Sequence, residues 1–369
     1  MNTQKITIVA GARPNFMKIA PIIHEIQGLQ CRLASINFRL VHTGQHYDAN
    51  MSDDFFKQLS IPKPHINLDC NSGTQIQQAA SIMIAFEKEL KANPTDLVLV
   101  VGDVTSSMAC AITAQRLCIK VAHVEAGLRS KDWSMPEEIN RLIIDSISNY
   151  LFTTSSLASK NLNESGYNKS KIFFVGNTMI DTLLKQLPNF KKPKFYDGLK
   201  LKKANYMVLT LHRPSNVDDK ECLNMLITEI INNTRNIPIV FPMHPRTVSV
   251  FNSLKINCTH LHVIKPMPYL EFNYLIQHAK AVITDSGGIT EETSVLNIPC
   301  LTLRNNTERP ITVSLGSNEL VGTNPKNIKK YLDILFNNQW KTSKHIPLWD
   351  GNASKRIVTV LINELKKTS

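Results

Sequence analysis

The sequence predicts an α/β protein with two doubly wound, Rossmann-like domains that face each other across a cleft. Short β-branched apolar runs alternate with longer amphipathic runs, which is typical of βαβ units and a parallel sheet. Runs such as LVLVV at 97–101 are apolar throughout, as expected for a strand covered on both faces. The alternation pauses once, at 184–204, and then resumes, so the 369 residues divide into two parts of ordinary domain size.

The first predicted domain covers residues 1–183. Near the end of the chain, Ile357, Leu361 and Leu365 have helical spacing, so we expect a helix at 354–367 that docks back on this domain. Within the domain, strands are expected at 6–10, 38–43, 97–102, 121–125, 150–154 and 172–176, and helices at 17–27, 74–91, 107–117, 137–148 and 155–165.

The second predicted domain covers residues 184–353. Its first part, 184–204, carries two prolines and seven lysines with few periodic apolar positions. We interpret it as a solvated charged connector or as the start of this domain, since a basic patch for single-stranded nucleic acid would interleave with more aromatic residues. Strands then follow at 206–211, 238–243, 262–264, 281–285 and 300–303.

Composition narrows the class of protein. The formal net charge of +12 favours an anionic partner, which leaves nucleic acid, anionic lipid or a phosphorylated small molecule open. We expect no nucleic-acid partner because no nucleic-acid motif occurs, and no membrane partner because no apolar run approaches the ~20 residues of a membrane span. No signal peptide is recognised, and the seven cysteines are widely spaced without a CxxC pair, so we expect reduced thiols, no metal site and a cytoplasmic location.

Polar clusters follow most of the predicted strands. After the first strand, Arg13 and Lys18 lie within about one turn of a helix start, where a guanidinium, an ammonium and backbone amides can bind phosphate. The alternative is an ordinary loop with surface cations. After the second strand comes the cluster TGQH, which contains Gln45.

Three carboxylates are candidates for acid/base chemistry. Asp103 follows the most apolar strand, although it could simply cap the next helix, as could Thr105 or Ser106. Glu125 ends a buried strand, where an unpaired carboxylate is unfavourable; the alternative to a functional role is pairing with His123 or Arg129. Glu137 opens a helix beside a proline, which helix-dipole chemistry alone could explain.

The second half repeats this placement. His212 and Arg213 end one predicted strand, and His244 ends the next. The run DSGGITEE at 285–292 is a strand end, a Ser-Gly-Gly turn and a helix start, which together form an amide cradle for a diphosphate. Glu292 in the first turns of that helix could accept ribose hydroxyls, and Arg304 and Arg309 add cations at the next strand end.

Taken in order, these clusters resemble the motifs of the non-hydrolysing UDP-N-acetylglucosamine 2-epimerases. The motifs that carry the resemblance run from about residue 6 to 322 and read GARPNFMK, TGQH, GDVTS, HVEAGLRS, MPEEINR, GNTMIDTLL, LHRPSN, DSGGITEE and RNNTERP. The resemblance implies a fold like that of GT-B glycosyltransferases, a UDP-sugar substrate, a homodimer, and no metal or nicotinamide cofactor. It also implies UDP-N-acetylmannosamine as the product, for bacterial surface polysaccharides.

The resemblance also assigns roles to residues of this sequence. Asp103, Glu125 and Glu137 would form the acid/base set, and His212 would support departure of the UDP oxygen. The other implied contacts are Arg13, Ser286, Gly287 and Gly288 with the diphosphate, Lys18 with phosphate and sugar, Glu292 with ribose, Met267 and Phe272 with uracil, and Arg309 with sugar or phosphate. Some relatives bind a second UDP-sugar as an activator, at positions that correspond to Gln45, Arg213 and His244.

Two departures from the family pattern stand near these positions. Many relatives have glutamate at Asn15, and many read HRRE where this chain reads His212-Arg213-Pro214-Ser215. The sequence leaves three alternatives open: a 2-epimerase of another UDP-sugar such as a diacetamido uronic acid, a hydrolysing relative that releases UDP and N-acetylmannosamine, and a GT-B glycosyltransferase.

Overall fold

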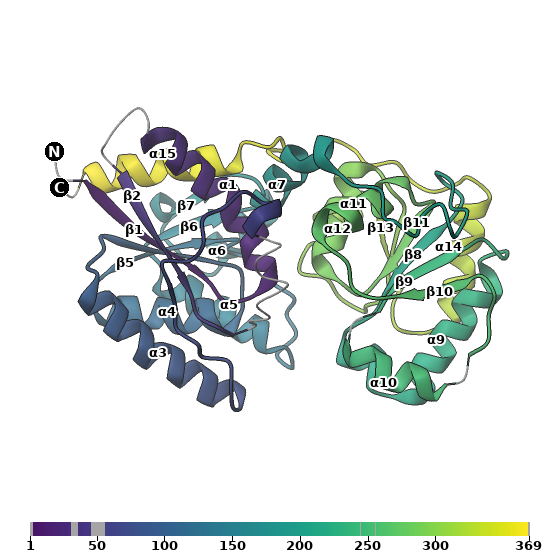
Figure 1. The fold of residues 1–369 in the computed structure, drawn as a ribbon. Helices are drawn as coiled ribbons and strands as arrows, with labels where there is room; N and C mark the ends of the chain where they lie inside the picture. Colours follow the sequence, from purple (N-terminus) through teal and green to yellow (C-terminus); the bar gives the residue numbers. More distant parts are fainter. Residues whose placement is uncertain (1–2, 31–35, 46–55, 244, 255, 368–369) are drawn as a thin grey trace. The chain divides into compact units, whose positions relative to one another are not determined.

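A computed structural model describes residues 3–30, 36–45, 56–243, 245–254 and 256–367; for Arg13, Pro245 and Arg246 it describes the backbone alone. The chain forms two compact units (Figure 1). The first unit comprises Met1–Gln186 and Pro347–Ser369, and the second comprises Leu187–Ile346. The first stretch therefore runs three residues past 183, and the chain returns to the first unit at Pro347, before the predicted helix.

The first unit is built on a parallel sheet with the strand order β3-β2-β1-β4-β5-β6-β7. The chain leaves β1 toward one edge and resumes at β4 on its other side, so the sheet is doubly wound as predicted. Its elements are β1 (Gln4–Ala10), α1 (Arg13–Gln30), β2 (Ile36–His42), β3 (Ile66–Asn67), α3 (Gln75–Ala92), β4 (Leu97–Val101), α4 (Thr105–Arg116), β5 (Lys120–Val124), α5 (Pro136–Ile147), β6 (Tyr150–Thr153), α6 (Ser156–Glu164), β7 (Ile172–Phe174), α7 (Thr178–Gln186) and α15 (Ala353–Lys366).

Helices form two layers against this sheet. Helices α3, α4 and α5 pack side by side in one layer, and α1, α7 and α15 pack together in the other (Figure 1). All five residues of β4 are fully buried between them, which explains the uninterrupted apolar run LVLVV. The short strand β3 was not predicted from the sequence.

The last helix docks on the first unit through both apolar and polar contacts. Ile357, Leu361 and Leu365 are buried. The carboxylate of Asp181 accepts hydrogen bonds from the amides of Ala353 at 3.1 Å and Ser354 at 2.7 Å, and from the Ser354 hydroxyl at 2.7 Å. Asp181 therefore satisfies amides at the start of α15 that have no partner within the helix.

The second unit has a parallel sheet of order β10-β9-β8-β11-β12-β13, which is also doubly wound. The elements of this unit are β8 (Met207–Thr210), α8 (Pro214–Val217), α9 (Lys220–Asn233), β9 (Ile239–Pro242), α10 (Pro245–Ser253), β10 (Leu261–Ile264), α11 (Tyr269–His278), β11 (Ala281–Thr284), α12 (Gly287–Leu296), β12 (Cys300–Thr302), α13 (Ile311–Ser314), β13 (Asn318–Leu320) and α14 (Lys326–Phe336). The strand β13 was not predicted from the sequence.

Of the two interpretations of 184–204, the structure supports the start of the second domain from Leu187 and excludes a solvated connector. Tyr196 and Leu201 are buried and pack with Tyr206 in one apolar cluster of the second unit. The ring of Tyr196 meets those of Tyr206 and Tyr274 edge-on, at 5.8 and 5.7 Å between centroids. The lysines stay at the surface while the aromatic residues between them pack inward, so the segment from Leu187 belongs to the second unit.

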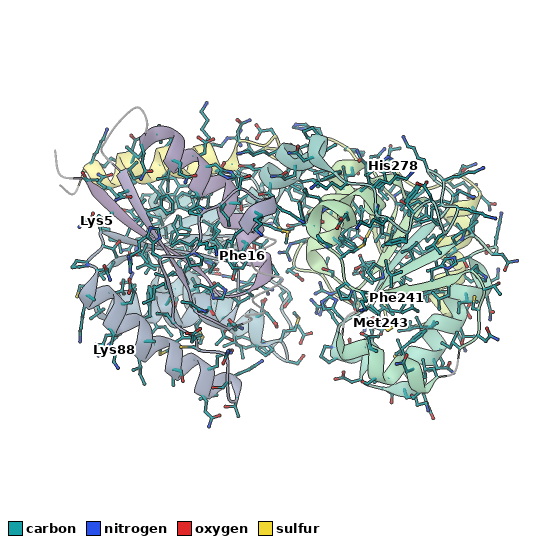
Figure 2. All side chains as sticks on the ribbon, in the orientation of Figure 1. Lys5, Phe16, Lys88, Phe241, Met243 and His278 are labelled. Atoms are coloured by element: carbon teal, nitrogen blue, oxygen red, sulfur yellow. The ribbon has the colours of Figure 1, made fainter. Side chains whose placement is uncertain are left out.

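On the other side of this sheet, a larger apolar cluster includes Phe241 and Met243 (Figure 2). Among the residues that the structure describes, no helix has the length and apolar content needed to cross a bilayer.

Candidate active site

In the first unit, Lys18 and Asp103 follow β1 and β4, which are neighbours at the point where the strand order reverses, and Glu125 follows β5, the next strand after β4. Asn15 fixes the loop after β1. Its Oδ1 accepts from the amides of Gly11 at 3.1 Å and Ala12 at 2.9 Å, and its Nδ2 donates to the Val101 carbonyl at 3.2 Å. A glutamate could not donate to that carbonyl, so this contact explains why asparagine suits this chain.

Lys18 and Glu125 form a buried ion pair. The Lys18 Nζ lies 2.5 Å from the Glu125 Oε2, and the side chains are only 7% and 2% exposed. Glu125 has a φ of +74°, a strained backbone conformation for a residue other than glycine. A Cβ at Gly102 would lie 3.1 Å from the Lys18 Nζ, so the absence of a side chain there makes room for the pair. The predicted alternatives, pairing of Glu125 with His123 or Arg129, are therefore wrong.

Asp103 does not cap the helix that follows it. Helix α4 has Val104 at its N-cap position, and this residue provides no side-chain cap. Instead, the Asp103 Oδ2 accepts from the Arg141 Nη2 at 2.7 Å and Nε at 2.9 Å. Arg141 also pairs with Glu138, which accepts from the Ser130 amide at 2.8 Å. This chain of contacts connects Asp103 to the loop before α5.

The two adjacent acids at the start of α5 have different environments. Glu138 is buried; burial alone would raise its pKa, but hydrogen bonds from Ser130 and Lys131 and the charge of Arg141 hold the pKa below its ordinary value. Glu137, the predicted site residue, is exposed and its side chain makes no hydrogen bond or ion pair with the described residues. Glu138 is therefore a structural acid, while Glu137 is accessible to a ligand.

A buried network supports the loop that carries Glu125. His123 contacts the Asp145 carboxylate through Nδ1 at 2.7 Å and the Gly102 carbonyl through Nε2 at 3.0 Å. Asp145 also accepts from the Arg129 Nη1 at 2.6 Å and the Gly127 amide at 3.2 Å. The strand ends that present Gly102 and Glu125 are thereby tied together through one imidazole.

Gln45, a predicted activator-site residue, contacts the start of α4. Its Oε1 accepts from the Ser106 amide at 3.1 Å and the Ser106 hydroxyl at 2.6 Å. A Cβ at Gly11 would lie 2.1 Å from the Ser106 Oγ, so glycine is required after β1. Through its two contacts with Ser106, Gln45 caps the start of α4 and so already has a structural role.

In the second unit, β8 and β11 are the neighbours at the strand reversal, and their ends meet at Asp285. Its buried carboxylate lies 2.7 Å from the His212 Nδ1 and accepts from the Arg213 amide at 2.9 Å and the Asn216 Nδ2 at 3.1 Å. Burial alone would raise the pKa of Asp285, but the contacts with His212 and the backbone amides hold it below its ordinary value. Asp285 thus orients the His212 imidazole, whose side chain is 44% exposed.

The predicted phosphate cradle is the start of α12. Ser286 is the N-cap residue, but its hydroxyl accepts no hydrogen bond from the first amides of the helix. Arg309 is buried nearby: its Nε lies 2.7 Å from the Glu291 Oε1, and its Nη1 pairs with Glu308. The helix start therefore offers amide donors beside a guanidinium held by two carboxylates. The backbone places Gly288 directly after Gly287 in the same helix turn.

Glu292 is almost fully buried, at 3% exposure. Its Oε1 accepts from the Tyr269 hydroxyl at 3.0 Å. Burial raises the pKa of Glu292 to about 7, against the lowering effect of hydrogen bonds from Tyr269 and Asn273. This carboxyl group can therefore take either protonation state near neutral pH.

The remaining predicted residues are placed less fully. Met267 and Phe272 are partly buried against the apolar cluster that contains Tyr206. Arg213 donates from Nε to the Asp285 carbonyl at 3.1 Å. His244 and the side chain of Arg13 lie outside the described residues.

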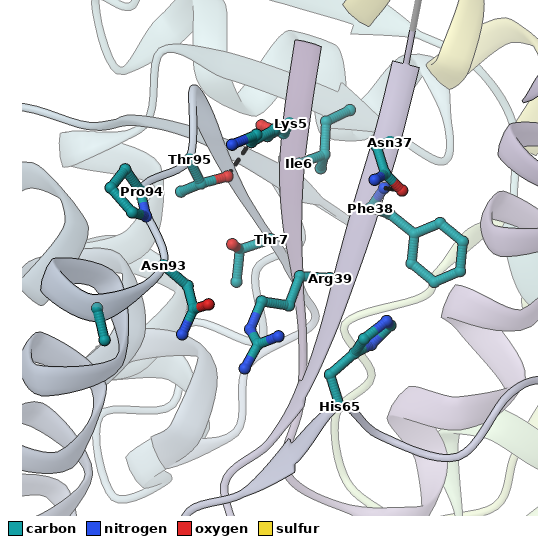
Figure 3. Close-up of a pocket in the computed structure, with 11 residues that line it drawn as sticks. Lys5, Ile6, Thr7, Asn37, Phe38, Arg39, His65, Asn93, Pro94 and Thr95 are labelled. Atoms are coloured by element: carbon teal, nitrogen blue, oxygen red, sulfur yellow. Dashed lines mark hydrogen bonds between the residues drawn. The ribbon is translucent and has the colours of Figure 1, made fainter. Parts of the chain in front are cut away.

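A pocket of about 340 Å³ lies away from these residues (Figure 3). Lys5, Asn37 and Arg39 line it, from the amino-terminal halves of β1 and β2, whereas the predicted site residues follow the carboxyl ends. Arg39 is paired with Glu89 there. Across the described ranges, no three His, Cys, Asp or Glu side chains are grouped so that they could hold a metal ion.

Comparison with known proteins decides the family. A family model described as UDP-N-acetylglucosamine 2-epimerase matches residues 30–362. The chain belongs to the UDP-N-acetylglucosamine 2-epimerase family. It is 41% identical over 371 residues to the UDP-N-acetylglucosamine 2-epimerase of Methanocaldococcus jannaschii, covering 97% of this chain and 98% of that protein. It is 39% identical over 321 residues to the UDP-2,3-diacetamido-2,3-dideoxy-D-glucuronate 2-epimerase of Pseudomonas aeruginosa, covering 86% and 88% of the two chains.

Solved structures agree with this membership of the UDP-N-acetylglucosamine 2-epimerase family. The crystal structure of the M. jannaschii enzyme in complex with UDP-GlcNAc and UDP matches with a TM-score of 0.87 at 40% identity, over 98% of this chain and all of that chain. A lipopolysaccharide outer core galactosyltransferase shares the fold alone, with a TM-score of 0.55 at 13% identity. The predicted two-domain, GT-B-like α/β fold is confirmed, and the chain is a member of an enzyme family of epimerases.

Several residues that organise the two clusters were absent from the sequence prediction. Asp285 contacts the imidazole of His212, and Arg141 and Glu308 form ion pairs with Asp103 and Arg309. All three stand inside the quoted motifs, and a buried strand end followed by charged residues is the signal that could have found Asp285. No sequence signal indicated which cation would pair with which carboxylate.

Proposed function

We propose that this chain catalyses reversible epimerisation of UDP-N-acetylglucosamine to UDP-N-acetylmannosamine at C2, by elimination and re-addition of UDP without hydrolysis. The observation that carries the proposal lies in the first unit: two carboxylates at the ends of the adjacent strands β4 and β5, each held by its own cation. Asp103 is paired with Arg141 and Glu125 with Lys18. The M. jannaschii relative, whose crystal structure contains UDP-GlcNAc and UDP, supports the choice of substrate.

The proposed reaction needs such groups because the C2 proton of the sugar is not acidic. In the first half, the bond between C1 and the UDP oxygen breaks, one carboxylate takes the C2 proton, and a C1–C2 double bond forms. In the second half, another acid protonates C2 from the opposite face and UDP adds back to C1. The two halves balance without an oxidant or reductant, and they require acid/base groups for both faces.

The three candidate carboxylates would divide this work. Glu125 and Asp103 are fixed by buried partners, while Glu137 at the start of α5 is exposed. In the second unit, the amides of Ser286, Gly287 and Gly288 and the guanidinium of Arg309 would hold the diphosphate, and His212 would support the departing oxygen. Stabilisation of that leaving group by preorganised donors supplies much of the catalysis in this type of reaction.

The nucleoside would be held by the second unit. Glu292 would accept the ribose hydroxyls, and Met267 and Phe272 would contact the uracil at the edge of their apolar cluster. Arg13 and Lys18 would contribute to the phosphate and sugar contacts. Gln45, Arg213 and His244 would serve a second, activating UDP-sugar, although Gln45 and Arg213 also have structural partners.

The test is a proton NMR time course in deuterium oxide with UDP-N-acetylglucosamine as the only substrate. UDP-N-acetylmannosamine with deuterium at C2 is the expected product. Turnover should fall strongly, while UDP binding survives, in each of the variants Asp103→Asn, Glu125→Gln and Glu137→Gln. Glu138→Gln cannot serve as a neutral control variant, because Glu138 binds the amides of the loop before α5. Release of free N-acetylmannosamine and UDP would instead place the chain among hydrolysing enzymes.

A second candidate function is 2-epimerisation of a UDP-diacetamido uronic acid. The P. aeruginosa relative named for that substrate favours it, at 39% identity. Turnover of UDP-2,3-diacetamido-2,3-dideoxy-D-glucuronate in the same NMR assay, with none of UDP-N-acetylglucosamine, would select this alternative. Both archaeal and bacterial relatives occur, so the role in bacterial surface polysaccharide synthesis stays a prediction.

The homodimer, the cytoplasmic location and the absence of a metal or nicotinamide cofactor also stay predictions. Light scattering of the purified chain would test the dimer. Activity of the purified chain after treatment with a chelator, with no nicotinamide added, would test the cofactor prediction.

A further inference from the structure

Arg304 is a buried arginine near the start of α12. It follows β12 and is only 3% exposed. Its Nη2 donates to the Glu308 Oε2 at 2.7 Å and to the Asn306 Oδ1 at 3.4 Å. Its Nε and Nη1 are also buried, and neither has an acceptor within the described part of the chain. A buried donor without an acceptor is unfavourable, so this guanidinium has unused capacity that a ligand could satisfy.

The guanidinium is directed at the first residue of α12. A Cβ at Gly287 would lie 3.4 Å from the Arg304 Nη1 and 2.6 Å from the Glu308 Oε1. Glycine at this position therefore lets Arg304 and Glu308 approach the helix backbone. The first amides of α12 receive no cap from the Ser286 side chain, and the Arg304 Nη1 lies close to Gly287, so both sets of donors are found at the same end of the helix.

Glu308 positions two arginines at this helix end. One carboxylate oxygen pairs with Arg304 and the other with Arg309, and Arg309 also pairs with Glu291. Two cations and two carboxylates balance in charge, so the arginines do not form a diffuse positive patch. Arg304 differs in that two of its buried nitrogens, Nε and Nη1, have no hydrogen-bond acceptor among the described residues.

We propose that Arg304 is a further phosphate-binding residue, which donates from Nε or Nη1 to the diphosphate of a nucleotide held at the start of α12. A guanidinium suits this role because one side can bind Glu308 while the other binds phosphate. The identity of the nucleotide as UDP rests on the proposed function. Arg304 is an addition to the diphosphate-binding residues that the family resemblance assigns.

The test uses calorimetry to compare the binding of UDP and of uridine to the unaltered chain and to the Arg304→Gln variant. Uridine shares the uracil and ribose but lacks phosphates. We expect the UDP affinity of Arg304→Gln to fall about tenfold or more, as for loss of a charge-assisted hydrogen bond, with uridine affinity unchanged. The matched control is Arg235→Gln, an exposed arginine of the same unit, which should leave both affinities unchanged.

Two results would overturn the inference and leave the proposed function intact: an unchanged UDP affinity in Arg304→Gln, or an equal fall for UDP and uridine, which would indicate a structural role. If the unaltered chain binds no UDP, both fall together. Should Arg304→Gln not fold, Arg304→Lys provides the same comparison, because one ammonium group cannot replace the guanidinium at both Glu308 and phosphate.

Discussion

Replacement of Glu292 by glutamine should change how the stability of the second unit depends on pH. Glu292 is 3% exposed, and its Oε1 accepts from the Tyr269 hydroxyl. Glutamine keeps the size of the side chain and an oxygen that can accept the same hydrogen bond, but it cannot ionise. The comparison therefore isolates the free energy of placing a charge at this buried position.

The magnitude follows from the raised pKa. Burial raises the pKa of Glu292 from 4.5 to about 7, so the native state holds its proton over a range of pH in which the unfolded chain has lost it. Each pKa unit corresponds to ~1.36 kcal/mol, which gives a penalty of about 3 kcal/mol for the native state. The penalty is absent below about pH 4.5, grows as the pH rises, and is complete above about pH 7.

Urea denaturation at a series of pH values between about 5 and 8 measures this effect. The chain has three tryptophans, of which Trp340 alone belongs to the second unit. In a background with Trp133→Phe and Trp349→Phe, fluorescence therefore reports the unfolding of that unit. The free energy of unfolding of Glu292→Gln should rise relative to the parent by about 2–3 kcal/mol between the two ends of the series.

The control for this prediction is Glu221→Gln, an exposed acid on α9 in the same unit, whose difference from the parent should stay constant with pH. A constant difference for Glu292→Gln as well would refute the reasoning, since it would mean that ionisation of Glu292 does not weaken the folded state. A constant offset alone is no contradiction, because the new amide group can gain or lose hydrogen bonds at every pH.

Three further predictions follow from the described contacts. Asn15→Ala should lower the stability of the first unit by about 2 kcal/mol in urea denaturation, because three buried hydrogen bonds are lost; an unchanged midpoint would contradict this. Asp181→Ala should speed amide hydrogen exchange at the start of α15, where it accepts three hydrogen bonds, and unchanged protection there would show that the helix needs no such anchor. If Glu292 accepts ribose hydroxyls, uridine should bind more tightly as the pH rises through about 7, which calorimetry measures, and a flat profile would remove Glu292 from the ribose site.

Much of the fold was predictable because parallel βαβ units leave a regular signal. A strand covered on both faces must be apolar along its whole length, and β4 has this pattern. The strands β3 and β13 have two and three residues and include asparagine, so no such signal marks them. The sequence left 184–204 open between a charged connector and the start of the second domain because its lysines dominate the composition, whereas its folded position is decided by Tyr196 and Leu201.

The residues of the candidate site were easier to predict than their partners. A charged residue at the end of a buried strand is visible in the sequence, and Asp103 and Glu125 were chosen as candidates in this way. Their partners depend on the order of strands in the sheet: Lys18 and Glu125 are 107 positions apart and meet because β1, β4 and β5 are neighbours. The left-handed backbone of Glu125 is likewise a consequence of tertiary contacts that no local pattern encodes.

The strand order also explains why both clusters occupy corresponding places in their sheets. Where the chain reverses its direction of winding, the connections after two neighbouring strands run to opposite faces, and the loops diverge to leave room for a ligand. In the first unit these strands are β1 and β4, which are followed by Lys18 and Asp103. In the second unit they are β8 and β11, which are followed by His212 and Asp285.

The same topological position has been filled with different chemistry in the two units. The first unit carries carboxylates held by separate cations, which suits proton transfer. The second carries a helix start with arginines held by carboxylates, which suits an anionic leaving group. Each of these charges is balanced by a buried partner. Removing a partner should therefore disturb the site as much as removing the residue proposed to contact the substrate. This expectation follows most directly from the contacts of Arg141 and Glu308.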